Sequence, residues 1–198
     1  ILWATGVAVI SLILFLVTLT TPWYVYYYSQ NLPNGDTQPT MVSFHLFSGI
    51  KNITMDIDTS GQHSNQTITL ITWPESPFEY LESVYSFSGA MTLGAFFTNV
   101  ACLVLLVLFQ FIPKDGLSPH RFIECFQINY KIWMIALTVL ACTTFSTFLL
   151  GALSFLRHPA AMGEDYENIY GTTCQAHVCY TFVGSNPDGS YWVPSTGW

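Results

Sequence analysis

Three long stretches of the chain contain no charged residue, and each is long enough for a helix to cross a lipid bilayer. A helix rises about 1.5 Å per residue, so roughly 20 apolar residues cross the ~30 Å of hydrocarbon in a membrane. A chain of 198 residues cannot surround three such helices with polar structure. We therefore predict one transmembrane helix in each stretch, over residues 1–21, 85–112 and 131–156.

Charge is scarce in this sequence and unevenly distributed. Only 9% of the residues are charged, against roughly a quarter in an ordinary soluble domain. Ten of the twelve acidic residues lie in the polar segments 22–84 and 157–198. The sequence has no basic patch that would neutralise phosphates, so we expect no nucleic-acid partner.

Two N-glycosylation sequons orient the predicted spans. Asn52-Ile53-Thr54 and Asn65-Gln66-Thr67 both lie in segment 22–84, and such triplets are modified only on the lumenal or extracellular side. Short loops rich in Lys and Arg stay cytoplasmic, and the loop 113–130 with its flank carries three of the five basic residues, Lys114, Arg121 and Lys131. We predict that segments 22–84 and 157–198 are extracellular or lumenal, in the plasma membrane or another membrane of the secretory pathway.

The segment 22–84 has the pattern of a small antiparallel β-sheet. Apolar and polar residues alternate over 41–46, 50–57 and 67–73, and period-2 runs bounded by Gly, Asn and Pro are typical of strands. The predicted fold is therefore a membrane α-helical bundle with a small extracellular β-sheet.

Cysteines divide between the spans and the second polar segment. Cys102 and Cys142 lie in predicted spans, whereas Cys174 and Cys179 lie close together outside the membrane. Nearby extracellular cysteines favour a disulfide; zinc binding with His177 is the alternative, although a fourth ligand is missing. Cys125 is expected to be a plain thiol, with palmitoylation as the alternative.

No catalytic motif is recognisable, and we predict that the protein is not an enzyme and needs no cofactor beyond N-linked glycans. The run that starts at Asp56 begins like a calcium loop, but Thr67 occupies the position of the expected Glu. The spans lack ionisable side chains at depth. Asn99 is the most polar residue there, and we expect it to hydrogen-bond a neighbouring helix.

Small residues recur at four-residue spacing in the second and third spans, and aromatic residues cluster near the ends of segment 22–84. Such spacing lets helices approach closely in lipid and predicts either internal bundling, which we favour, or oligomerisation. The helix-packing candidates are Ser86, Ala90, Gly94, Thr147 and Gly151. The candidate interface residues, partly core and partly exposed, are Trp23, Tyr24, Tyr26, Trp73, Phe78 and Tyr80.

This layout resembles the claudin-like superfamily of tetraspan membrane proteins. The first span ends at Thr21-Pro22-Trp23, a β-rich segment follows, and Phe47-Ser48-Gly49-Ile50 stands near the position of the family's Gly-Leu-Trp motif. The family's cysteine pair in the first outer loop is absent, and the second loop carries the pair instead. The resemblance implies a four-helix bundle beneath an extracellular sheet, so we expect a fourth span after Trp198.

The expected function is that of a non-enzymatic multi-pass membrane glycoprotein. Its extracellular segments would act in adhesion, junction-like assembly or membrane organisation, with membrane lipid and either further copies of itself or other membrane proteins as partners. The alternative is an auxiliary subunit of a larger channel or receptor complex.

Overall fold

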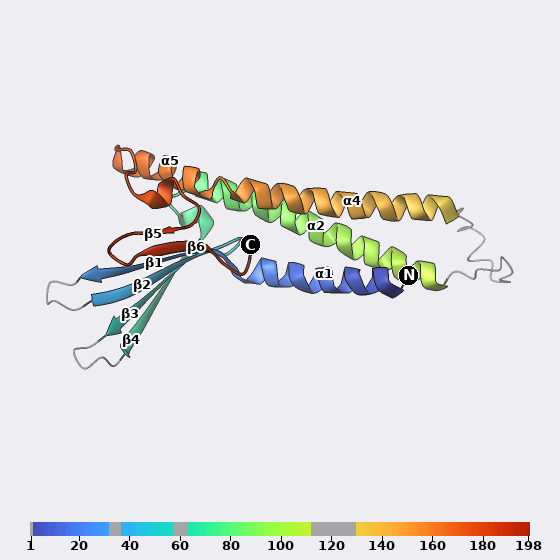
Figure 1. Cartoon of the computed structure of the whole chain (residues 1–198), viewed down its shortest axis with the longest axis horizontal. Helices are drawn as coiled ribbons and strands as arrows, with labels where there is room; N and C mark the ends of the chain where they lie inside the picture. The colour runs from blue at the N-terminus through green and yellow to red at the C-terminus, as the bar shows by residue number, and fades with distance from the viewer. Residues whose placement is uncertain (1, 32–36, 58–62, 112–129) are drawn as a thin grey trace. The chain divides into compact units, whose positions relative to one another are not determined.

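The structure is a computed structural model that describes residues 2–31, 37–57, 63–111 and 130–198. Its main helices are α1 (Leu2–Thr20), α2 (Glu79–Phe111), α4 (Tyr130–Phe155) and α5 (His158–Tyr170), with short 3-10 turns η1 (Trp73–Glu75) and η2 (His177–Cys179). Its strands are β1 (Pro22–Asn31), β2 (Thr37–His45), β3 (Gly49–Ile57), β4 (His63–Ile71), β5 (Gly184–Ser185) and β6 (Tyr191–Pro194). Figure 1 shows these elements along the chain.

Three of the described helices are long and apolar enough to cross a membrane, in the three stretches where the sequence predicts spans. The qualifying ranges are Trp3–Thr20, Glu79–Leu108 and Met134–Phe155. Helix α2 begins six residues before the predicted start at residue 85. The early start has a physical cause, because the Asp165 carboxylate accepts the backbone N–H groups of Tyr80 and Leu81 at 2.9 and 2.8 Å. Unpaired N–H groups at a helix start need such an acceptor.

The chain divides into two compact units. The first consists of Ile1–Leu16 and Met91–Leu150, and polar contacts join its helices. The Asn99 side chain donates a hydrogen bond to the Ala8 carbonyl at 3.2 Å, which confirms the predicted bond to a neighbouring helix. Thr144 donates to the Thr98 hydroxyl at 2.9 Å.

The small residues of the predicted packing face on α2 are not the ones buried within this chain, and their role in helix packing stays a prediction. Buried polar and small side chains on this helix are Ser88, Thr92, Ala95 and Asn99. Ser86 and Ala90 are exposed, Gly94 and Thr147 are half-buried, and Gly151 is buried. Hydroxyl and amide groups, rather than the small-residue spacing, therefore mark where α2 is buried.

The second unit, Val17–Ala90 and Gly151–Trp198, contains a six-stranded sheet. The strand order is β4-β3-β2-β1-β6-β5, and all neighbours are antiparallel. The predicted antiparallel sheet is confirmed, with strands β2, β3 and β4 in the predicted alternating runs. Strand β1, helix α5 and the pair β5–β6 were not predicted. The sheet thus combines residues from both polar segments of the sequence.

An aromatic core fills the second unit on one side of this sheet. It includes the buried side chains of Trp23, Tyr24, Phe44, Tyr85, Phe155 and Trp192. Buried indole N–H groups need acceptors, and each buried tryptophan finds a backbone carbonyl. Trp23 donates to Thr18 at 2.8 Å, Trp73 to His45 at 2.9 Å and Trp192 to Thr181 at 3.0 Å.

Candidate functional site

The two faces of the sheet differ in what they contact. Directly opposite residues of paired strands share a face, and successive residues alternate between faces. One face carries Tyr24, Phe44 and Ile50, which are opposite one another in register and belong to the aromatic core. This face therefore holds the sheet to the rest of its unit.

The other face carries an unbroken row of apolar and aromatic side chains, which we call the bare face. In register, Tyr191 of β6 is opposite Tyr27, Tyr27 opposite Met41, Met41 opposite Ile53, and Ile53 opposite Ile68. The row thus crosses five strands. A second row on the same face runs through Val193, Val25, Ser43, Lys51 and Leu70.

Several side chains of the bare face are exposed although they are apolar. Ile68 is 54% exposed, Leu70 55% and Tyr191 42%. The rings of Tyr191 and Tyr27 are stacked with centroids 4.5 Å apart. None of these residues belongs to the aromatic core. Within the two rows the exposed apolar side chains lie on β4 and β6, whereas Tyr27 and Met41 are half-buried and Val25, Ser43 and Ile53 are buried. Exposed apolar side chains on a sheet face are often found at protein contacts.

The bare face is also nearly free of charge. Lys51 is the one Lys, Arg, Asp or Glu in its two rows. His45 follows Ser43 on the same side of β2, and burial, with a smaller contribution from Lys51, lowers its pKa. The seven acidic residues of this unit whose side chains the structure describes all lie outside the two rows: Glu75, Glu79, Glu82, Glu164, Asp165, Glu167 and Asp188.

A buried histidine lies at the centre of the aromatic core. His158 has no exposed surface, its ring centroid is 4.0 Å from that of Tyr24, and its Nδ1 is 3.3 Å from the Tyr85 hydroxyl. Its Nε2 is buried without a hydrogen-bond partner among the described residues. Burial lowers the pKa of His158 from 6.5 to about 3, so the ring is neutral at physiological pH. Nothing in the sequence marked His158 as a core residue.

Asp165 is the second buried ionisable group that sequence analysis missed. It is 1% exposed, and its two carboxylate oxygens accept the N–H groups at the start of α2. Burial raises the pKa of Asp165, and the two backbone hydrogen bonds oppose that shift. Asp165 thus ties α5 to α2 within the second unit.

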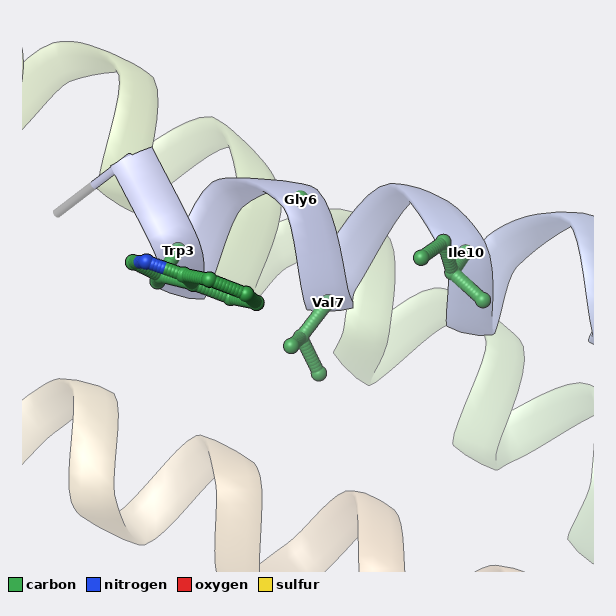
Figure 2. A pocket seen from close by; sticks show the side chains of 4 residues that line it. All are labelled: Trp3, Gly6, Val7 and Ile10. Carbon is green, nitrogen blue, oxygen red and sulfur yellow. The ribbon is translucent and has the colours of Figure 1, made fainter.

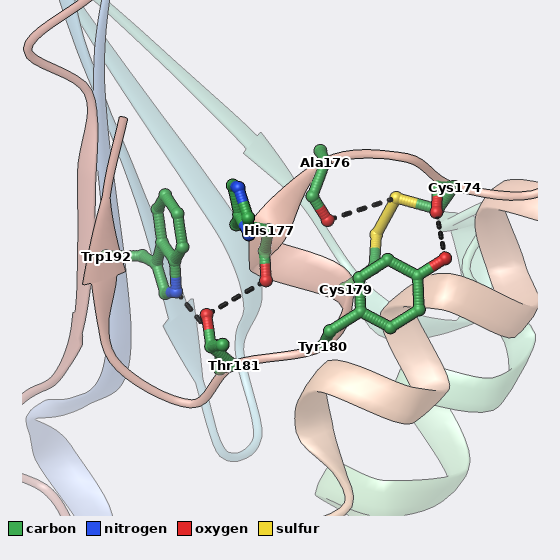
Figure 3. The surroundings of a disulfide bond; sticks show 7 residues. All are labelled: Cys174, Ala176, His177, Cys179, Tyr180, Thr181 and Trp192. Atoms are coloured by element: carbon green, nitrogen blue, oxygen red, sulfur yellow. Dashed lines mark hydrogen bonds between the residues drawn. A yellow bond between two sulfur atoms is a disulfide. The ribbon is translucent and has the colours of Figure 1, made fainter. Parts of the chain in front are cut away.

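The predicted pairing of Cys174 with Cys179 is present in the structure. Figure 3 shows how the closed loop is connected: the Tyr180 hydroxyl donates to the Cys174 carbonyl, and Thr181 donates to the His177 carbonyl at 2.9 Å. The indole of Trp192, on strand β6, donates to the Thr181 carbonyl. The disulfide loop is therefore joined to the sheet by hydrogen bonds on its C-terminal side.

The predicted glycosylation sites fall on neighbouring strands. Asn52 is half-buried on β3 between Val42 and Thr69 in register, on the side of the sheet that faces the core. Its Oδ1 is buried without a hydrogen-bond partner among the described residues. Asn65 is opposite Asp56 in register. Asp56 is an even number of residues from Asn52 along β3, so Asn65 and Asn52 belong to the same face of the sheet. The side chain of Asn65 is not among those that the structure describes. Glycosylation of both remains a prediction.

The candidate interface aromatics divide between core and surface. Trp23, Tyr24 and Trp73 are buried, Tyr26 and Phe78 are half-buried against the core, and Tyr80 is 43% exposed. The exposed aromatic side chain in the two rows of the bare face is instead that of Tyr191, which stacks on the half-buried ring of Tyr27. The predictions on Lys114, Arg121 and Cys125 concern positions outside the described residues, and the side chain of Lys131 also lies outside them.

A hollow along α1 has a different character. Trp3, Gly6, Val7 and Ile10 line about 250 Å³ on one face of the helix, and Figure 2 shows their side chains. The lining contains no ionisable group, so it offers no acid, base or nucleophile. Within the described residues, no three His, Cys, Asp or Glu side chains converge closely enough to hold a metal ion.

The fold and its surfaces define a class: the described residues contain three helices long and apolar enough to cross a membrane and one disulfide-bonded unit built around an antiparallel sheet. No protein-family model matches the chain, and no curated protein matches it.

Proposed function

We propose that the protein is a non-enzymatic multi-pass membrane glycoprotein that acts in adhesion, junction-like assembly or membrane organisation through its sheet unit. The observation that carries this proposal is the bare face, an apolar and aromatic row across five strands with exposed Ile68 and Leu70. Leaving apolar side chains such as these exposed to water costs free energy. It is best explained by a contact with another protein.

The same proposal places the sheet unit outside the membrane. Support comes from the sequons at Asn52 and Asn65 and from the Cys174–Cys179 disulfide, which is typical of oxidising compartments. A claudin-like relationship belongs to the proposal as well and rests on the sequence layout alone.

A cell-aggregation assay tests the proposed function. The full-length protein is expressed in non-adherent cells, and clustering is counted against cells that express a variant with Ile68→Lys and Leu70→Lys. We expect clustering, or co-clustering of the protein into patches within one membrane, only with the unsubstituted chain. Equal behaviour of both cell lines, with equal surface expression, would contradict the proposal.

The alternative, an auxiliary subunit of a larger channel or receptor, gives a different result. Purification from native membrane in a mild detergent would then yield a larger partner in fixed stoichiometry. Recovery of the chain alone or with further copies of itself favours adhesion or assembly.

A further inference from the structure

We propose that the bare face binds the bare face of a second copy of this chain, forming a two-layered β-sandwich. The inference rests on the proposed function and specifies its partner and its surface. A sheet with an apolar face is stable when that face is buried against another layer. The aromatic core packs against one side of this sheet at Tyr24, Phe44, Ile50 and Trp192, so a second sheet is the natural layer for the other side.

Charge favours a second copy at this face. The chain has a formal net charge of −7, so most of its surface would repel another copy. The two rows of the bare face contain one charged residue, Lys51, and none of the seven acids of the unit whose side chains are described. Two copies can therefore approach through this face with little like-charge repulsion.

The order of side chains along the row is self-complementary. Packed sheets keep their strands within about 30° of each other. A two-fold axis along the strand direction, passing through Met41, places Met41 on its own counterpart and reverses the row. The aromatic end with Tyr191 then meets the aliphatic end with Ile68, and Lys51 meets Val25 rather than a second lysine. Large flat rings thus pack on branched aliphatic side chains.

The predicted glycans would leave this contact open. Asn52 lies on the opposite side of the sheet from Ile53, because successive strand residues alternate. Register places Asn65 opposite Asp56, at an even spacing from Asn52 along β3, so both sequon positions belong to the core side of the sheet. Glycans attached there would shield the core side and not the bare face.

The size of the face sets the strength of the contact. Five strands about 4.8 Å apart and two rows about 7 Å apart give roughly 300 Å² of flat area per copy. Stable complexes bury about 800 Å² per partner. The contact is therefore weak in dilute solution, and it forms when membrane insertion raises the effective concentration of copies to the millimolar range. The test must use membranes.

Cysteine crosslinking in membranes tests the inference. In full-length protein with Cys102, Cys125 and Cys142 replaced by Ala, Met41→Cys is compared with Thr69→Cys, which is exposed on the other side of the sheet. Packed sheets are about 10 Å apart, so a short bismaleimide can join the two copies. We expect dimers on a denaturing gel from Met41→Cys and at least about tenfold less from Thr69→Cys, although Thr69 is the more exposed residue.

A second part of the experiment introduces a charged side chain into the bare face. Placing Ile68→Lys in the Met41→Cys protein should lower dimer yield by about tenfold, because a charge would be buried without a partner, whereas Thr69→Lys should leave the yield unchanged. Intact Cys174–Cys179 pairing and membrane delivery show that each variant folds. Equal crosslinking from both cysteine positions, or none from Met41→Cys, would overturn the face-to-face contact. If the face-to-face contact fails but a different membrane protein co-purifies and the Ile68→Lys change removes it, the bare face binds another partner and the proposed function stands. If neither cell clustering nor co-purification is observed, the proposed function fails as well.

Discussion

Acid should destabilise the sheet unit through His158. Histidine has a pKa of about 6.5 in an unfolded chain, and burial lowers that of His158 to about 3 in the folded protein. The unfolded state therefore binds a proton first as the pH falls. Stability from this residue is fully present above pH 6.5 and is lost progressively between pH 6.5 and 3.

The magnitude follows from the size of the shift. Each pKa unit corresponds to about 1.4 kcal/mol, so the full loss below pH 3 is about 5 kcal/mol. At pH 5 the loss is about 2 kcal/mol. For a chain of this size, that lowers the unfolding midpoint by roughly 4–8 °C. The ionisable groups that face the ring are Tyr24 and Tyr85, which carry no charge in this pH range and so supply no counter-ion.

Thermal unfolding in detergent at pH 7.5, 6 and 5 measures this effect, with tryptophan fluorescence reporting on the buried Trp23 and Trp192. His158→Gln removes the titrating ring and should flatten the pH dependence. His177→Gln changes an exposed histidine and should leave the dependence intact. Asp165 acts in the opposite direction, because its pKa is raised by burial and protonation favours the fold as the pH falls through that value. An equal slope in wild type and His158→Gln would refute the assignment of the acid sensitivity to His158.

Three further predictions concern other parts of the chain. Asp165→Ala removes both acceptors at the start of α2 and should cost about 1–2 kcal/mol in thermal unfolding, while Asn168→Ala, at an exposed position of the same helix, should cost little. Asn99→Leu breaks the bond to the first helix and should cost about 0.6 kcal/mol in a detergent-denaturation titration, so an unchanged midpoint would contradict the role of that bond. Asn52→Gln and Asn65→Gln should each lower the mass of the cell-expressed protein by one glycan, and an unchanged mass in both would overturn the predicted orientation.

The three membrane-spanning helices and the strands β2, β3 and β4 were predictable because each depends on a local sequence pattern. Absence of charge over a membrane's thickness is sufficient to identify α1, α2 and α4 as candidates. Alternation is sufficient for β2, β3 and β4. In each case, the environment of a residue is set by its near neighbours in sequence.

The misses have a common cause in contacts between distant segments. Strand β1 is rich in tyrosine, which indicates a membrane interface as readily as a strand, and its pairing with β6 joins residues such as Tyr27 and Tyr191 that lie far apart in sequence. Helix α5 starts at His158 and Pro159 and is stabilised through Asp165, whose partners are on α2. No local pattern distinguishes this aspartate from an exposed one. Similarly, Ser86 and Ala90 have favourable spacing, yet Ser88 is the residue that hydrogen-bonds Ser154 at 2.7 Å.

Strand β1 shows why the bare face could not be predicted from the sequence alone. Its odd and even positions serve different purposes: Tyr24 packs on His158 in the core, whereas Tyr27 stacks on Tyr191 in the bare face. A substitution at Tyr24 would therefore weaken the sheet and the bare face together, and loss of assembly in such a variant would say nothing about contact. A substitution at Tyr27 changes the bare face without removing a core contact. Adjacent residues on one strand can therefore distinguish an effect on folding from an effect on assembly. Ile68 and Thr69 on β4 are such a pair, which is why they are compared in the crosslinking test.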